Sequence, residues 1–169
     1  VICNTAASST FQNCNMRSDM RAGERLTGSA DCFVKVNQNL AYQRPVIQGS
    51  TFEDKSADKA VDGSIDWPAC THTQNTDNWW QVDLGRQYAV GTVNIYHRSE
   101  STAEVNSRLV GALLILSIDG RPSVRSNTGG REYGHVCGTL NVGGGTPEVL
   151  QCGGQLGRYI TVSIPPTQD

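Results

Sequence analysis

The sequence predicts an all-β fold, an antiparallel β-sandwich, because its apolar residues recur in short alternating runs separated by turn residues. Gly is abundant, at 18 of 169 residues, and glycines with many β-branched residues are typical of short strands joined by turns. A βαβ fold would need helical patterns of about 10–15 residues between the strands, and the sequence contains none. The length predicts one main domain.

Four segments carry the strand pattern. In residues 78–85, Trp80, Val82 and Leu84 alternate onto one face, and Gly85 is expected to end the strand in a turn. The other three expected strands are residues 88–97, 113–119 and 159–164. Glycine runs at 129–130 and 143–145 are expected to be turns, and neither has the strand-to-helix setting of a phosphate loop.

The charge balance excludes several classes of protein. Lys and Arg total 14 and Asp and Glu total 16, for a net charge of −2. This balance argues against a nucleic-acid-binding protein, which needs a basic surface, and gives little attraction to anionic membranes. No apolar stretch approaches the about 20 residues of a membrane span.

The six cysteines indicate an oxidising compartment. Their spacing fits neither a CxxC motif nor a zinc site, so an even number of widely spaced cysteines favours three disulfides in a secreted protein. They are Cys3, Cys14, Cys32, Cys70, Cys137 and Cys152. No charged-then-apolar leader opens the chain, so we expect the mature form.

Two regions are expected. Residues 1–36 hold three of the cysteines and little apolar periodicity, so they are predicted to be a disulfide-tied extension on a main domain of residues 37–169. Residues 17–25 are either a short helix or a solvated loop.

No catalytic motif is present. The chain lacks GxSxG, HExxH and P-loop sequences, and its carboxylates are scattered. We therefore expect no enzyme.

The segment 78–85, which reads NWWQVDLG, resembles the discoidin-like (coagulation factor 5/8 C-type) superfamily. Neighbouring motifs resemble the F-type lectins, or fucolectins, and the resemblance spans about residues 37–166. They are an opening strand at 39–41 before Pro45, a calcium loop at 60–63, Cys-Thr-His at 70–72 and a late core strand at 157–162. The resemblance implies a jelly roll with short loops.

The resemblance also implies a sugar site formed by His72, Arg98 and Arg108, with Trp67 nearby against the sugar methyl. A neutral deoxysugar needs directed hydrogen bonds, which the planar fork of Arg and a neutral His supply, together with an apolar surface. Arg108 follows Glu100 after seven residues, which makes this loop longer than the family pattern. The family's adjacent cysteine pair is also absent from this loop, so the shape of the loop and the exact sugar preference do not follow from the resemblance. Apart from the resemblance, each of these residues fits an ordinary loop or surface position.

A structural calcium ion is implied in the same way. The resemblance assigns a carboxylate from Asp62 and main-chain carbonyls from Lys59, Ser64 and Ala69. Calcium prefers such all-oxygen sets. The family's last strand, which brings Cys-Glu to this site, has no counterpart before Asp169. We hypothesise that the first residues supply that strand, with Asn4 in place of the Glu.

The resemblance implies a disulfide between Cys137 and Cys152 in a late hairpin. The strand hypothesis adds Cys3 with Cys70, and Cys14 with Cys32 would then close the extension. Other pairings stay open, because sequence alone does not determine connectivity.

Together these inferences predict a secreted, calcium-containing lectin for L-fucose or fucosylated glycans. By family analogy it would act in innate recognition of microbial glycans or in cell adhesion. Homo-oligomers are expected, because single-site affinity for a monosaccharide is weak and several linked sites raise avidity. The alternative is a discoidin-type adhesion module that binds membranes or proteins, with Trp67 as an exposed apolar contact.

Overall fold

A computed structural model gives the fold, which contains six strands and one short 3₁₀ helix in the part of the chain that it describes. The elements are β1 (Ile2–Ser9), β2 (Val46–Gln48), η1 (Ala57–Ala60), β3 (Trp79–His97), β4 (Leu113–Ser117), β5 (His135–Thr139) and β6 (Glu148–Ser163). The described residues are 2–9, 39–65, 69–74, 78–98, 107–121, 134–141 and 147–163.

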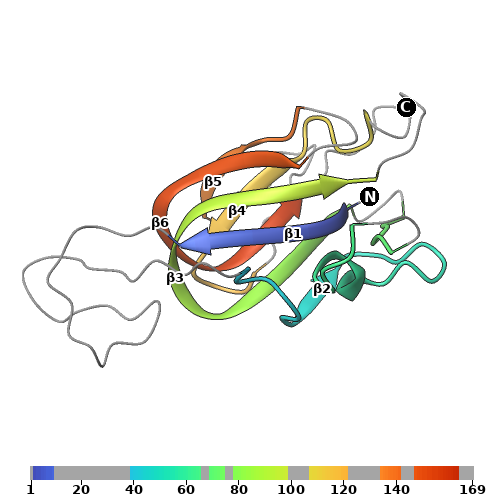
Figure 1. The fold of residues 1–169 in the computed structure, drawn as a ribbon, viewed down its shortest axis with the longest axis horizontal. Helices are drawn as coiled ribbons and strands as arrows, with labels where there is room; N and C mark the ends of the chain where they lie inside the picture. The colour runs from blue at the N-terminus through green and yellow to red at the C-terminus, as the bar shows by residue number, and fades with distance from the viewer. Residues whose placement is uncertain are drawn as a thin grey trace, which may run out of the picture.

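The strands form one antiparallel sheet that folds over on itself. Its order is β1-β3-β6-β4-β5, and β2 pairs with the first part of β3. The two long strands, β3 and β6, pair along most of their length and bend back at the same end of the molecule (Figure 1). The first part of β3 and the last part of β6 therefore lie in one layer with β2 and β4, while their other parts lie in the second layer with β1. The predicted all-β antiparallel sandwich is confirmed.

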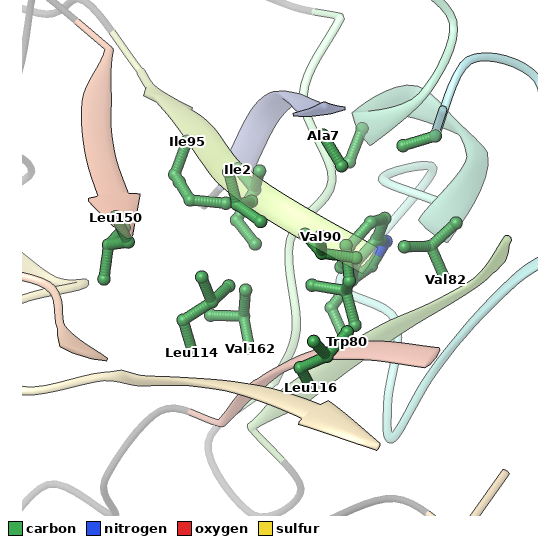
Figure 2. Close-up of a cluster of buried hydrophobic side chains, with 14 of the residues drawn as sticks. Ile2, Ala7, Trp80, Val82, Val90, Ile95, Leu114, Leu116, Leu150 and Val162 are labelled. Atoms are coloured by element: carbon green, nitrogen blue, oxygen red, sulfur yellow. The ribbon is translucent and has the colours of Figure 1, made fainter. Parts of the chain in front are cut away.

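The core lies between these layers. Figure 2 shows apolar side chains from β1, β3, β4 and β6 converging there. The later part of β3 alternates between buried and partly exposed residues, whereas all five residues of β4 are buried. The labelled members are Ile2, Ala7, Trp80, Val82, Val90, Ile95, Leu114, Leu116, Leu150 and Val162.

The predicted turn at Gly85 does not end the strand. Instead β3 continues to His97, and the register between Asp83 and Tyr88 shifts as the strand bends. Gly85 has φ of 87°, a left-handed conformation that glycine adopts at little cost, and its N–H donates to the Asp83 carboxylate at 2.7 Å. The turn residues thus form an irregularity within one strand, so two expected strands are one.

Three other strand boundaries also differ from the predictions. Residues 39–43 lead into a turn, and the strand in this region is β2. The strand predicted at 113–119 ends at Ser117, and the one predicted to begin at 159 begins at Glu148.

Part of the predicted extension belongs to the main sheet. β1 pairs with β3 from Ile2 opposite His97 to Ser9 opposite Val90, and the side chains of Ile2 and Ala7 are buried in the core. The N-terminal strand therefore completes the second layer. The predictions for residues 17–25, the two glycine runs, Cys14 and Cys32 fall outside the described residues.

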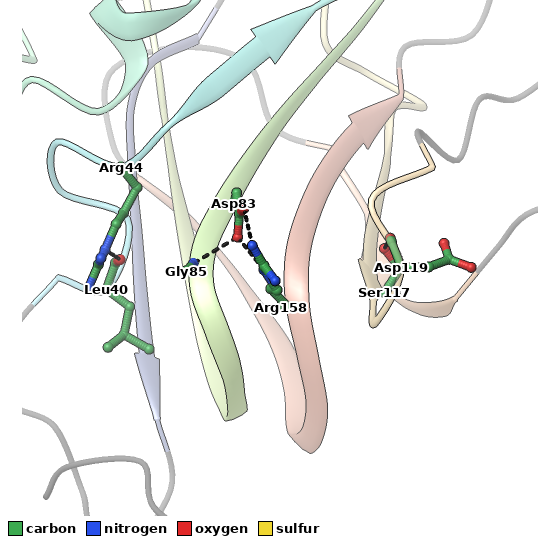
Figure 3. A network of polar contacts seen from close by, with 7 residues as sticks. All are labelled: Leu40, Arg44, Asp83, Gly85, Ser117, Asp119 and Arg158. Atoms are coloured by element: carbon green, nitrogen blue, oxygen red, sulfur yellow. Dashed lines mark hydrogen bonds and ion pairs between the residues drawn. The ribbon is translucent and has the colours of Figure 1, made fainter.

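An ion pair joins the long strands near their bends. Arg158 donates from Nε and Nη2 to the two Asp83 oxygens, each at 2.7 Å (Figure 3). The hydrogen bond from Arg158 is the main reason that the pKa of Asp83 lies below its usual value. In the described residues no helix is long and apolar enough to cross a membrane.

Candidate functional site

His72 lies in a segment that β1 and the loop 52–55 hold through main-chain hydrogen bonds. The N–H of Thr71 donates to Ile2 O of β1 at 2.9 Å. His72 N–H donates to Lys55 O at 3.2 Å, and its carbonyl accepts from Phe52 N–H at 2.9 Å. The position of this imidazole is thus set by contacts between distant parts of the sequence.

Phe52 adds an aromatic ring beside His72. The two ring centroids are 4.8 Å apart and the planes are tilted by 46°. Phe52 is 38% exposed, so part of its ring is open to solvent next to the imidazole. Sequence reasoning missed Phe52, because an isolated aromatic residue in a loop gives no signal of what it will contact. Trp67, the aromatic residue predicted for this site, lies outside the described residues.

The two predicted arginines come from different elements. Arg98 directly follows β3, and Arg108 is exposed in the turn 107–111 that precedes β4. That turn is closed by Val110 N–H donating to Ser107 O at 2.9 Å. Residues 99–106, including Glu100, are outside the described part.

Electrostatics relates these arginines to the histidine. The pKa of His72 is lowered from 6.5 to about 4, chiefly by burial and then by the positive charges of the N-terminal amino group, Arg108, Arg98 and Lys55. Both guanidinium groups therefore lie within electrostatic range of the imidazole. At neutral pH the imidazole is uncharged, so it presents one donor and one acceptor.

We expect this low pKa to appear in the pH dependence of stability. His72 is neutral in the folded protein down to about pH 4 but binds a proton near pH 6.5 when unfolded. Unfolding takes up that proton between these values, so the His72 contribution destabilises the fold as the pH falls through this window. Urea unfolding at about pH 7 and about pH 5 should show that the free energy of unfolding falls less between these pH values in His72→Gln than in wild type. An equal loss in both would contradict the assignment.

The predicted calcium loop follows η1. Asp62 is exposed, its Oδ1 accepts from Ser64 N–H at 2.8 Å, and Gly63 has φ of 90°. The Lys59 ammonium lies 3.8 Å from the Asp54 carboxylate. An ammonium group has no lone pair, so Lys59 would offer only its carbonyl to an ion.

This donor set consists of oxygens, which suits calcium in kind. Within the described residues no group of three or more His, Cys, Asp or Glu gathers, so the site would depend on main-chain carbonyls, including that of Ala69. The side chain of Asn4 is not among those described.

Two disulfide positions are visible. Cys137 of β5 and Cys152 of β6 form the predicted bond. Cys70 is disulfide-bonded and fully buried. Because Ile2 pairs with Thr71 in an antiparallel bridge, the backbone of Cys3 comes opposite that of Cys70.

Comparisons with known proteins agree with this architecture. Residues 59–162 match the F5/F8 type C family model, described as a NedA-like, galactose-binding domain. The sandwich is thus a domain of the galactose-binding-like class. The chain belongs to the coagulation factor 5/8 type C, discoidin-like family and, within it, to the F-type lectins.

Three relatives illustrate the similarity. Fucolectin-6 of Anguilla japonica is 30% identical over 135 residues, which cover 76% of this chain and 66% of that protein. The fucolectin from striped bass (Morone saxatilis) serum has a TM-score of 0.63 at 26% identity, over 82% of this chain and 46% of that one. A fucose-binding module of Streptococcus pneumoniae has a TM-score of 0.56 at 29% identity, over 75% of this chain and 83% of the module. The chain thus spans less than half of the striped bass protein.

Proposed function

We propose that this protein is a secreted lectin that binds L-fucose or fucosylated glycans through His72, Arg98 and Arg108. The observation that supports it most is the electrostatic proximity of the two guanidinium groups to a neutral, partly buried imidazole. Relatives that are named as fucolectins or as a fucose-binding module support the choice of sugar. Secretion is supported by the disulfides, which persist in oxidising compartments.

The chemistry of the three side chains suits an uncharged sugar. Each guanidinium group donates in a planar fork to neighbouring hydroxyl oxygens. His72 stays neutral throughout the physiological range, so it can accept from one hydroxyl group and donate to another oxygen. The exposed part of the Phe52 ring supplies an apolar surface beside the imidazole for the CH groups of the sugar.

Retention on immobilised L-fucose tests the proposal. The protein should be retained, and free L-fucose should elute it, while D-mannose at the same concentration should not. Pure protein should also release no product from aryl fucosides. Binding to anionic liposomes that ignores free fucose would contradict the proposal and favour an adhesion module. Retention that D-mannose abolishes equally would contradict the sugar assignment.

We also propose that the N-terminal strand secures His72 through a Cys3–Cys70 disulfide. The antiparallel bridge between Ile2 and Thr71 sets the two cysteines opposite each other, and Cys70 is only two residues before His72. Mass mapping of the unreduced protein should find this peptide pair. A link from Cys70 to Cys14 or Cys32 would overturn the assignment.

A structural calcium ion, held by Asp62 and the carbonyls of Lys59, Ser64 and Ala69, with Asn4 as a further ligand, is part of the proposal. The ion would neutralise the carboxylate and fix the loop that follows η1. A ligand that binds only the folded state stabilises it by about 2.7 kcal/mol when it is present at about 100 times its Kd.

We therefore expect a chelator to lower the unfolding temperature by several degrees and added calcium to restore it. Scanning calorimetry of the chelated and reloaded protein measures the difference. The Asp62→Asn variant should lose this response, whereas Asp119→Asn, a change at another exposed turn, should keep it. A wild-type unfolding temperature that does not change when the chelator is added would contradict the calcium site.

A further inference from the structure

A buried pair of a histidine and a carboxylate, His97 and Glu148, joins strand ends next to the candidate sugar site. His97 is the last residue of β3 and is 7% exposed. Its Nε2 lies 3.4 Å from Oε2 of Glu148, the first residue of β6. The other carboxylate oxygen accepts from Asn141 N–H at 2.8 Å, and the Asn141 amide donates to Thr139 O of β5 at 2.8 Å. Glu148 thus connects the ends of three strands.

The burial of His97 affects its protonation and its dependence on Glu148. Burial is the main cause that lowers the pKa of His97, and the Glu148 carboxylate opposes it. A buried imidazole loses its hydration, and the buried Nε2 of His97 makes no hydrogen bond within the described residues, so the Glu148 carboxylate 3.4 Å away compensates it by proximity alone. Removing Glu148 would leave His97 buried without its carboxylate and would release the contact to Asn141.

The pair is adjacent to Arg98 in the chain. Successive residues at the end of a strand point to opposite sides, so His97 continues the inward face of Val93 and Ile95 while Arg98 leaves that face. The Nε atom of Arg98 is itself buried, and the charge of Arg98 acts on His72. The placement of Arg98 therefore depends on how firmly the end of β3 is held.

We propose that His97 and Glu148 are positioning residues that hold the end of β3 and so direct Arg98 toward the sugar. The predicted effect of this pair on fucose affinity rests on the proposed function, whereas its predicted effect on the position of the Arg98 side chain does not. Neither residue touches the sugar in this proposal. Their effect on affinity passes entirely through Arg98.

The chain offers a matched control. Asp83 also joins β3 to β6 through an ion pair, with Arg158, but it does so near the bends of the long strands. Glu148→Ala should weaken fucose affinity about tenfold, which corresponds to about 1.4 kcal/mol. Glu148→Gln, which keeps the shape and an acceptor oxygen, should retain most of the affinity. Asp83→Ala should lower stability but leave affinity unchanged, and an equal loss of affinity in Glu148→Ala and Asp83→Ala would overturn the proposal.

A measurement without sugar tests the positioning role of His97 and Glu148 separately from the proposed fucose binding. The NMR signal of the Arg98 side-chain N–H group, assigned with Arg98→Lys, should shift in Glu148→Ala and stay in place in Asp83→Ala. An unmoved signal in Glu148→Ala overturns the positioning role. If the wild type does not bind fucose but the Arg98 signal still shifts in Glu148→Ala, the positioning role is supported and the proposed function fails. If Glu148→Ala does not fold, Glu148→Gln and His97→Asn are measured in the same way, and an unmoved signal in both is the overturning result.

Discussion

Replacing Arg98 with alanine should abolish detectable fucose binding while the protein stays folded. A hydrogen bond from a charged donor contributes about 1.5–3 kcal/mol, and a guanidinium fork supplies two of them. A single monosaccharide site is weak from the start, so this loss takes the affinity below detection. Titration calorimetry with free fucose measures the affinity, and circular dichroism with thermal unfolding checks the fold.

Arg108→Ala should give the same result, because both guanidinium groups act on His72 from separate elements. Arg121→Ala is the matched control. Its guanidinium group is also exposed in a turn and lies 2.9 Å from Asp119, with no assigned role in the sugar site. Normal binding by Arg98→Ala, or the same loss in Arg121→Ala, would refute the site.

Much of the fold was predictable from the alternation of apolar residues. Trp80, Val82 and Leu84 face inward as their spacing indicates, and Leu114 and Leu116 meet them in the core. Alternation reports which face of a strand is buried, and in a sandwich that face points to the other layer. The antiparallel class follows from this pattern and from the absence of helical segments.

The long strands and the edge strand were not predictable in this way. An Asp-Leu-Gly sequence gives the same local signal whether the chain turns away or stays in a bent strand, and the pairing of Asp83 with Tyr159 and of Tyr88 with Gly157 decides between them. Likewise, Ile2–Ser9 has too few apolar residues for its alternation to predict a strand. Its place is decided by long-range pairing with β3, which local pattern does not report.

The candidate site depended on family resemblance. His72, Arg98 and Arg108 are far apart in the sequence, and each alone fits an ordinary surface position. Only the fold could bring them together, because His72 is held by β1 and the loop around Lys55 while Arg98 follows β3. Phe52 and the His97–Glu148 pair became visible only through contacts across segments.

Replacing Trp80 with alanine should cause the largest loss of stability. The side chain is 1% exposed in the centre of the core, and its indole N–H donates to Ala57 O, where η1 begins, at 3.0 Å. Truncating a buried Trp costs about 3–5 kcal/mol through lost contacts and the remaining cavity. This is a large part of the about 5–15 kcal/mol that stabilises a typical domain. Urea denaturation should show a midpoint lower by about 1 M or more.

Trp79→Ala is the matched control, since Trp79 is the neighbouring residue on the opposite face of β3 and is only half-buried. The loss of stability in Trp79→Ala should be clearly smaller, and equal losses would contradict the assignment of Trp80 to the core.

Trp80→Phe separates packing from hydrogen bonding, because it keeps an aromatic ring and removes the N–H donor to Ala57. Since η1 leads into the proposed calcium loop, Trp80→Phe should also reduce the stabilisation that added calcium provides. A calcium response equal to that of wild type would show that the loop is held independently of this hydrogen bond.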